Sequence, residues 1–374
     1  MEKHLKWAEE VEKKIINKYE KTIERNKTNI PYTTVNGRFD DWTDKNLCWW
    51  TNGFWGGILW QLYNASGKEA FKTMAEELEI KLDKNLMTAW GLDHDNGFKW
   101  LPTAVADYKL TGNKESKNRG LLAANNLAGR FNPAGSFIRA WNDNGDGSTA
   151  GWAIIDCMMN LPLLYWAGEE TNDPRFKHIA VAHGYTAMKY FIREDGSANH
   201  IVEFNPETGE FIRAMGGQGY KEGSSWTRGQ AWALYGFTLS YIHTKNKDFL
   251  DTAKRVADYF ISNIPDDGII PVDFCQPEEP AYEDSTAAAI AACGLLELKK
   301  YVDDAHKEKY YNSAIKLLIT LEEKRCSFTD EKDNIVEKCT AAYHDKEHEF
   351  SIIYGDYYFI EAILKLTGKE LFIW

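Results

Sequence analysis

The pattern of apolar and polar positions along this chain predicts two kinds of helix. Near the start, apolar side chains recur at steps of three and four, which places them on one helix face with Lys and Glu opposite. This stripe consists of Leu5, Ala8, Val11, Ile15, Tyr19 and Ile23. Residues 154–166, 231–242 and 287–298 are apolar almost all round, which is typical of helices buried on every side. The first kind predicts outer helices and the second kind inner helices.

A recurring helix-end pattern divides the chain into units. An aromatic or apolar helix end is followed by a polar turn, often with Gly or Asn, which favours the left-handed conformation that terminates helices. The pattern occurs at residues 63–69, 108–114, 165–170, 241–246, 301–304 and 364–369. The spacing of roughly 45 to 75 residues fits one inner helix, one outer helix and a loop. Six such hairpins predict an all-α (α/α)6 barrel, with an open helical solenoid as the alternative.

One segment between the helices has the pattern of a β-hairpin. Residues 200–204 and 210–213 alternate like strands, and residues 205–209 contain Asn, Pro and Gly in the order of a turn. We expect this hairpin to lie with the long loops at the mouth of the barrel. Because no linker or change of composition divides the chain, we predict a single catalytic domain over residues 1–374.

Charge and composition exclude several classes of partner. The chain has 44 basic and 56 acidic residues, a formal charge of −12, and this field disfavours nucleic acid and anionic membranes. The charged start and the lack of a long apolar stretch predict a cytoplasmic protein. None of the six cysteines forms a C-x-x-C pair, and no metalloprotease, P-loop or serine hydrolase motif is present. We therefore expect no metal and no cofactor.

Asp156 is the first candidate for chemistry, because it lies within the apolar run 154–166. If Ser148 or Thr149 caps a helix there, Asp156 lies about two turns in, beyond the stabilising positive end. Burial should then raise its pKa and make it a usable general acid. Asn160 follows one turn later on the same face. The alternative is a structural carboxylate that accepts hydrogen bonds from backbone or Asn amides.

Asp95 is the second candidate carboxylate. It stands before Asn-Gly at the start of the helix that ends near Tyr108, where an N-cap alone would explain an Asp. The alternative is a pair with Asp156 across the barrel mouth, since both residues precede inner helices, two units apart in sequence.

Aromatic and basic residues in the predicted loops complete the candidate site. Trp50, Trp141 and Trp226 lie in polar loops outside any helical stripe and would provide flat walls for a sugar ring. The guanidinium of Arg228 suits a carboxylate ligand, although an ion pair at a helix start is the alternative. His200 carries a titratable proton, or is a histidine on a strand surface.

Six stretches of the chain resemble glycoside hydrolase family 88, the unsaturated glucuronyl hydrolases. They are residues 50–57, 94–98, 154–164, 223–232, 284–288 and 355–359. The resemblance implies an (α/α)6 barrel that removes a 4,5-unsaturated uronic acid from the non-reducing end of lyase-generated oligosaccharides. It places the two important aspartates at Asp95 and Asp156. The sugar-site residues that it implies are Trp50, Trp141, His200, Gln218, Trp226, Arg228 and Trp232, to which Asn160 is added from its position beside Asp156.

The reaction implied by the resemblance is a hydration of the C4=C5 double bond. Asp156 would protonate C4 and then activate water for addition at C5, while Asp95 holds ring hydroxyls and keeps Asp156 protonated. Residues 343–349 lack the Ser-x-x-Ser-x-Lys pattern of relatives that favour sulfated fragments, and Gly217 replaces a histidine of some relatives. The alternatives are an unsaturated rhamnogalacturonyl hydrolase acting on pectin fragments and a non-catalytic sugar-binding barrel.

Overall fold

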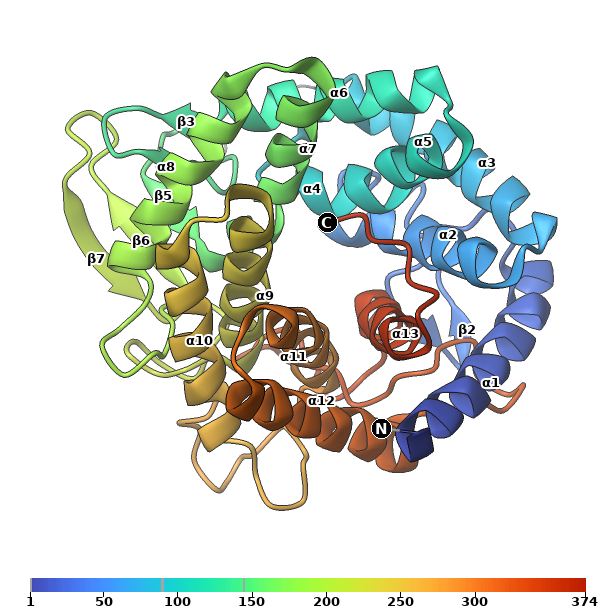
Figure 1. The fold of residues 1–374 in the computed structure, drawn as a ribbon. Helices are drawn as coiled ribbons and strands as arrows, with labels where there is room; N and C mark the ends of the chain where they lie inside the picture. The colour runs from blue at the N-terminus through green and yellow to red at the C-terminus, as the bar shows by residue number, and fades with distance from the viewer. Residues whose placement is uncertain (1, 89–90, 144) are drawn as a thin grey trace.

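Inner and outer helices alternate along the chain and close into a double ring (Figure 1). The computed structural model describes residues 2–88, 91–143 and 145–374. The outer helices are α1 (Glu2–Asn26), α3 (Glu69–Leu86), α6 (Lys114–Gly129), α8 (Pro174–Tyr190), α10 (Lys247–Ser262) and α12 (Asp304–Arg325). The inner ring consists of α2 (Phe54–Ser66), α4 (Asn96–Trp100) with α5 (Ala106–Thr111), α7 (Leu161–Thr171), α9 (Thr227–Thr244), α11 (Ser285–Leu298) and α13 (Ile353–Thr367). The predicted (α/α)6 barrel is therefore confirmed.

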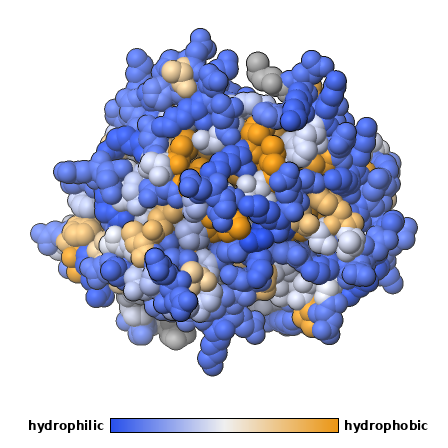
Figure 2. All heavy atoms as spheres, turned by 90° about the horizontal axis from the view of Figure 1, so that it is seen from below, coloured by the Kyte–Doolittle hydropathy of each residue, from blue (hydrophilic) through white to orange (hydrophobic). Residues whose placement is uncertain are grey.

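Burial follows the two sequence patterns. Every residue of α11 is buried, as is α9 from Thr227 to Ser240, because these helices are apolar all round. Helix α1 buries one face, which contains the apolar stripe from Ala8 onward together with polar residues such as Glu12 and Lys18, whereas Leu5 is exposed, so the buried stripe begins one turn later than predicted. Figure 2 shows one face of the molecule as largely hydrophilic with small, scattered apolar patches. In the part of the chain that the structure describes, no helix has both the length and the hydropathy needed to cross a bilayer.

The ring closes between the first outer helix and the last inner helix. Helix α13 packs against α1, α2 and α11. The Tyr19 hydroxyl of α1 donates to Asp356 Oδ2 of α13 at 2.6 Å, and the backbone N–H groups of Ile335 and Val336 donate to the same carboxylate. This closure contradicts the open solenoid.

The C-terminal segment runs to the centre of the ring in Figure 1. Trp374 is 1% exposed, stacks on Tyr358 and meets Phe98 edge to face. Its indole N–H donates to Glu361 Oε2 at 2.6 Å, and the Gln61 side chain pairs with both backbone groups of Leu371. These contacts fill the ring interior at the inner helices' C-terminal ends, and the sequence did not predict them.

A small sheet lies beside the ring. The predicted hairpin is confirmed as β6 (Ile201–Phe204) and β7 (Phe211–Met215), which pair antiparallel. A third strand that we did not predict, β5 (Trp152–Ile154), pairs with β6. Two short hairpins, β1 (Thr34–Val35) with β2 (Arg38–Phe39) and β3 (Phe131–Asn132) with β4 (Phe137–Ile138), complete the strands of the described residues.

The predicted helix over residues 154–166 is wrong in its first half. The chain leaves β5 into a 3-10 helix, η4 (Ile155–Met159), and only then enters α7 at Leu161, with Pro162 in the first turn. Pairing of residues 152–154 with β6, where Ile154 lies opposite Ile201, outweighs the helical pattern here. Ser148 and Thr149 therefore do not cap this helix.

The predicted helix ends are mostly correct. Gly67, Gly112 and Gly368 adopt the left-handed conformation at the ends of α2, α5 and α13. Helix α7 differs, since it continues through Gly168 to Thr171, and its C-cap residue Asn172 has a φ of 53°. Asn also tolerates this left-handed conformation, so the helix ends one turn later than predicted.

Candidate active site

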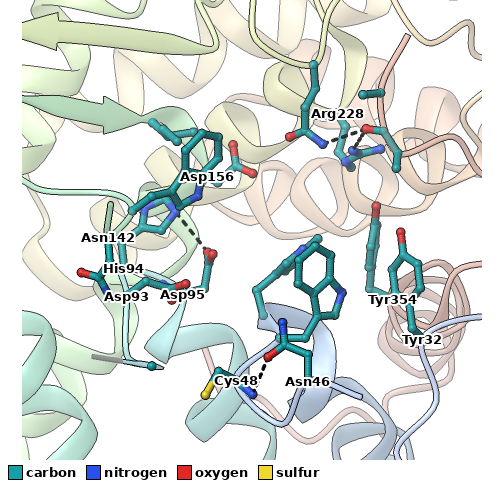
Figure 3. A pocket seen from close by; sticks show the side chains of 18 of the residues that line it. Tyr32, Asn46, Cys48, Asp93, His94, Asp95, Asn142, Asp156, Arg228 and Tyr354 are labelled. Atoms are coloured by element: carbon teal, nitrogen blue, oxygen red, sulfur yellow. Dashed lines mark hydrogen bonds and ion pairs between the residues drawn. The ribbon is translucent and has the colours of Figure 1, made fainter. Parts of the chain in front are cut away.

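A cavity of about 630 Å³ opens where the inner helices have their N-terminal ends. Its wall includes residues just before or at the starts of α2, α4, α7, α9 and α13, so the positive ends of several helix dipoles converge on it. Figure 3 shows a carboxylate side of this cavity opposite a side with a guanidinium and two phenols. The carboxylate side has Asp93, Asp95 and Asp156. The opposite side has Arg228, Tyr32 and Tyr354.

Asp156 enters this cavity from the first turn of η4, not from two turns inside a helix as predicted. Its side chain is 14% exposed, and its Oδ1 has no hydrogen-bond partner among the described residues. Burial raises the pKa of Asp156 to about 7, the Asp95 carboxylate adds to the rise, and His94 and Arg228 oppose it. The predicted direction is therefore correct, although the predicted local structure is wrong.

Asp95 precedes α4, and the inner helices that follow Asp95 and Asp156 are consecutive rather than two units apart. Its side chain makes no capping bond, so the N-cap explanation of this carboxylate is wrong. Asn160 Nδ2 donates to Asp95 Oδ1 at 3.2 Å, and His94 Nε2 lies 3.3 Å from the same oxygen. The structure thus places both carboxylates on the same side of one cavity.

Asn160 joins the two carboxylate segments from behind the cavity. Its Nδ2 also donates to the Asp156 carbonyl at 3.4 Å, and its Oδ1 accepts the Phe98 N–H at 2.8 Å. A Cβ on Gly97 would lie 2.5 Å from Asn160 Cα, so only Gly permits this approach of α4 to η4. The side chain is fully buried and does not border the cavity, which indicates a brace rather than the predicted sugar contact.

His200 is buried beside Asp156 rather than on a strand surface. The Gln218 N–H donates to His200 Nδ1 at 2.9 Å, so a neutral ring carries its proton on Nε2. That nitrogen lies 3.7 Å from Asp156 Oδ1. Burial lowers the pKa of His200 to about 3, and Arg228 contributes in the same direction. His200 is therefore a neutral donor next to the candidate acid.

Arg228 borders the cavity, but its guanidinium is largely occupied. Nη1 donates to Asp284 Oδ2 and to the Thr340 carbonyl, both at 2.6 Å, and Nη2 donates to the Ala341 carbonyl at 2.5 Å. Gln218, which also borders the cavity, donates from Nε2 to the same Ala341 carbonyl at 2.8 Å. The ion-pair alternative thus describes Arg228, and both side chains hold the loop before α13 in place.

The four candidate tryptophans divide into two groups. Trp50 and Trp141 border the cavity, as expected of sugar-binding walls. Trp226 and Trp232 are buried behind it. Trp226 packs on the His200 ring with centroids 4.2 Å apart, and Trp232 lies on the inner face of α9 against the aromatic core.

Several residues of the cavity were missed by the sequence analysis. They are Tyr32, Asn46, Asp93, His94, Asn142, Asp345 and Tyr354. The run Asp93-His94-Asp95 held a usable signal, because three ionisable residues in a row before a buried helix are unusual. The missed residues in other loops carried no such sequence signal, since only the closed ring brings them together. No group of His, Cys, Asp and Glu side chains suited to a metal ion occurs among the residues that the structure describes.

A closed double ring with paired aspartates and tryptophans in one mouth defines a toroidal glycosidase. The model of Glycosyl Hydrolase Family 88 matches residues 7–369, and the chain belongs to this family. It is 38% identical over 333 residues to the unsaturated glucuronyl hydrolase of Bacillus sp. (strain GL1), covering 87% of this chain and 88% of the relative. It is 35% identical over 331 residues to the unsaturated chondroitin disaccharide hydrolase of Streptococcus pneumoniae, covering 87% and 83%.

Solved structures give the same relationship. The crystal structure of the unsaturated glucuronyl hydrolase from Bacillus sp. GL1 matches with a TM-score of 0.88 at 33% identity, over 97% of this chain and 96% of that one. The unsaturated glucuronyl hydrolase from Streptococcus agalactiae matches with a TM-score of 0.90 at 30% identity, over 98% and 93%. The chain is thus an enzyme of the unsaturated glucuronyl hydrolase type.

Proposed function

We propose that this enzyme removes the 4,5-unsaturated uronic acid from the non-reducing end of lyase-generated oligosaccharides, with Asp156 as general acid and base. The observation that carries the proposal is Asp156 itself. Its Oδ1 is unpartnered among the described residues, it borders the cavity, and burial raises its pKa to about 7, so a proton is available near neutral pH.

The reaction begins with transfer of the Asp156 proton to C4 of the vinyl ether, which leaves a cation at C5 stabilised by the ring oxygen. The new carboxylate then takes a proton from a water that adds to C5, so Asp156 ends the cycle protonated again. His200 Nε2, 3.7 Å from Asp156 Oδ1, stabilises the carboxylate between the two steps. The hemiketal formed at C5 opens, and the partner sugar leaves as an alcohol.

The other groups of the cavity bind and orient the sugar. Asp95 accepts hydrogen bonds from ring hydroxyls and, as a neighbouring negative charge, keeps Asp156 protonated. Trp50 and Trp141 provide flat apolar surfaces for the ring. The uronate carboxylate faces a protein of net charge −12, so local donors and helix N-termini at the cavity must offset this repulsion.

The preferred substrates in this proposal are glycosaminoglycan-type disaccharides. Relatives are named for unsaturated chondroitin disaccharides, and related structures contain dGlcA-Glc-Rha-Glc and dGlcA-GalNAc6S. In this chain Asp345 borders the cavity, where a carboxylate would repel a sulfate group. We therefore propose that unsulfated disaccharides are hydrolysed faster than their sulfated counterparts, and that pectin-derived fragments are the alternative substrates.

The test follows the ultraviolet absorbance of the conjugated double bond in a panel of unsaturated disaccharides, including chondroitin, sulfated chondroitin, heparin and rhamnogalacturonan fragments. Wild-type enzyme should abolish the absorbance of its substrate. Asp156→Asn should retain it almost completely, because the amide keeps the shape but transfers no proton. Asp266→Asn, in an exposed surface turn, is the matched control and should behave as wild type. Full activity of Asp156→Asn would contradict the mechanism, and no turnover of any fragment would favour a sugar-binding barrel.

We also propose that residues 1–374 act as one catalytic domain and that the protein works in the cytoplasm. The family model matches residues 7–369. All six cysteines are free thiols, which suits a reducing compartment. Cell fractionation with antibody detection tests the location.

A further inference from the structure

His94 lies between the candidate catalytic carboxylates and a buried thiol. Its side chain is 1% exposed, and its Nε2 lies 3.3 Å from Asp95 Oδ1 (Figure 3). The backbone fixes its position too, because the His94 N–H donates to the Ala140 carbonyl at 3.1 Å. The second ring nitrogen, Nδ1, has no hydrogen-bond partner among the described residues.

Cys157 occupies the space beyond this ring. It follows Asp156 in η4, its side chain is fully buried, and it lies close enough to His94 and His183 for both imidazoles to lower the pKa of its thiol. His183 of α8 is also fully buried, and its Nδ1 accepts the Ile138 N–H at 3.0 Å. His183 Nε2 has no hydrogen-bond partner among the described residues. The two histidines, the thiol and Asp95 form one buried cluster.

We propose that His94 is a positioning residue, which orients the Asp95 carboxylate for the reaction, with the Cys157 thiol and His183 behind it. This inference rests on the proposed function, since it assigns His94 a part in the same site. The cluster contains residues of the outer helix α8, of η4 and of the segment before α4, and so it extends from the outer wall to the cavity.

The electrostatics of the cluster support a charged imidazole on His94. Burial lowers the pKa of His94, but Asp95 and the Cys157 thiol outweigh it and leave the pKa well above its usual value. Burial raises the pKa of Cys157, yet His183 and His94 lower it to about 6. At neutral pH these shifts favour an imidazolium between a carboxylate and a thiolate. The other ionisable groups that face this pair are Asp93, Asp156, His200 and Arg130.

The positive charge on His94 has two consequences for catalysis. Together with Asn160 it holds Asp95 through Oδ1, which leaves Oδ2 available for sugar hydroxyls. It also lowers the pKa of Asp156, opposing the rise caused by burial and by Asp95. Removal of the charge alone should therefore raise the pH at which the general acid is lost.

The decisive variant is His94→Gln, whose amide can donate to Asp95 but carries no charge. We expect kcat/KM to fall about 10- to 100-fold, as for other misplaced catalytic groups. We also expect the decline of kcat/KM at high pH to move to higher pH. His178→Gln, on the exposed face of α8, should leave both quantities unchanged. A purely structural His94 would lower the rate without moving the pH profile, and that outcome would overturn the proposal.

A second measurement needs no activity and separates this inference from the proposed function. In protein labelled with 15N-histidine, the His94 signals, assigned by their loss in His94→Gln, should show both nitrogens protonated at neutral pH. In Cys157→Ser, His94 should lose its proton at a lower pH than in the wild type, because a hydroxyl replaces the thiolate. A neutral His94 in the wild-type protein, or an unchanged titration in Cys157→Ser, refutes the inference even if the enzyme hydrolyses its substrate.

Discussion

Replacement of Asp156 by Asn should stabilise the protein, and the gain should depend on pH. In the folded protein the pKa of Asp156 is about 7, against 3.8 for an ordinary Asp. Between these pH values the folded protein holds a proton that the unfolded chain has released. The free energy of unfolding therefore falls as pH rises through this window, and above pH 7 the whole penalty of a buried carboxylate is present. The amide that replaces the carboxylate does not titrate and escapes this penalty.

The size of the effect follows from the difference in pKa. A difference of about 3, at about 1.4 kcal/mol for each tenfold change in the proton equilibrium, amounts to about 4 kcal/mol. For a chain of 374 residues the entropy of unfolding is about 0.8 kcal/mol per kelvin, so the corresponding change in Tm is about 5 °C. The amide has its own burial cost, but that cost is independent of pH.

Calorimetry from pH 4.5 to pH 8 tests this reasoning. The Tm of Asp156→Asn minus that of the wild type should increase by about 4 °C across the range, because part of the full change of about 5 °C is already present at pH 4.5, and most of the increase should occur below pH 7. Asp266→Asn removes one surface charge from the same acidic protein and corrects for net repulsion. A difference in Tm that stays flat with pH would show that Asp156 is not held in its protonated form, and the acid role would lose its basis.

Three further outcomes are expected. For the wild type, kcat/KM should decline tenfold per pH unit above about pH 7, because Asp156 must be protonated to attack C4; a profile flat to pH 9 contradicts this. Trp374→Ala should lower the free energy of unfolding by about 3 to 5 kcal/mol in denaturant titrations, since it leaves a cavity and an unpaired Glu361 oxygen, whereas Trp374→Phe should lose less. Gly97→Ala should lower kcat at least tenfold, because its Cβ meets Asn160 at 2.5 Å and separates the two carboxylate segments; wild-type kcat would refute that coupling.

Periodicity sufficed to predict the ring but not its local exceptions. Inner helices such as α9 and α11 are apolar on all faces, so a single-sequence pattern distinguishes them from the half-exposed outer helices. The same reasoning failed for residues 152–159, because an apolar run has no periodicity that distinguishes a buried strand from a buried helix. Only the pairing of β5 with β6, some fifty positions later in the chain, decides the outcome.

The candidate site could be predicted from the sequence where a residue type is unusual for the stretch of chain around it. A carboxylate in an apolar run pointed to Asp156, and a carboxylate before a predicted inner helix pointed to Asp95. Aromatic rings in polar loops pointed to Trp50 and Trp141, and the resemblance added Gln218 and Trp232. The sequence does not show whether a side chain borders the cavity or is buried behind it. Trp226 and Trp232 were therefore assigned to the cavity, although they pack behind it. Arg228 likewise has the residue type of a ligand-binding group, but its partner Asp284 comes from another inner helix, which no local pattern indicates.

The bond between Tyr19 and Asp356 spans 337 positions, and it bears on synthesis in the cell. A nascent chain cannot form it until nearly the whole polypeptide has left the ribosome. Helices α9 and α11 emerge earlier, with apolar surfaces that the later helix α13 will cover. The growing chain thus exposes apolar surface for much of translation. We expect chaperones that bind such surface to act on this chain during that period.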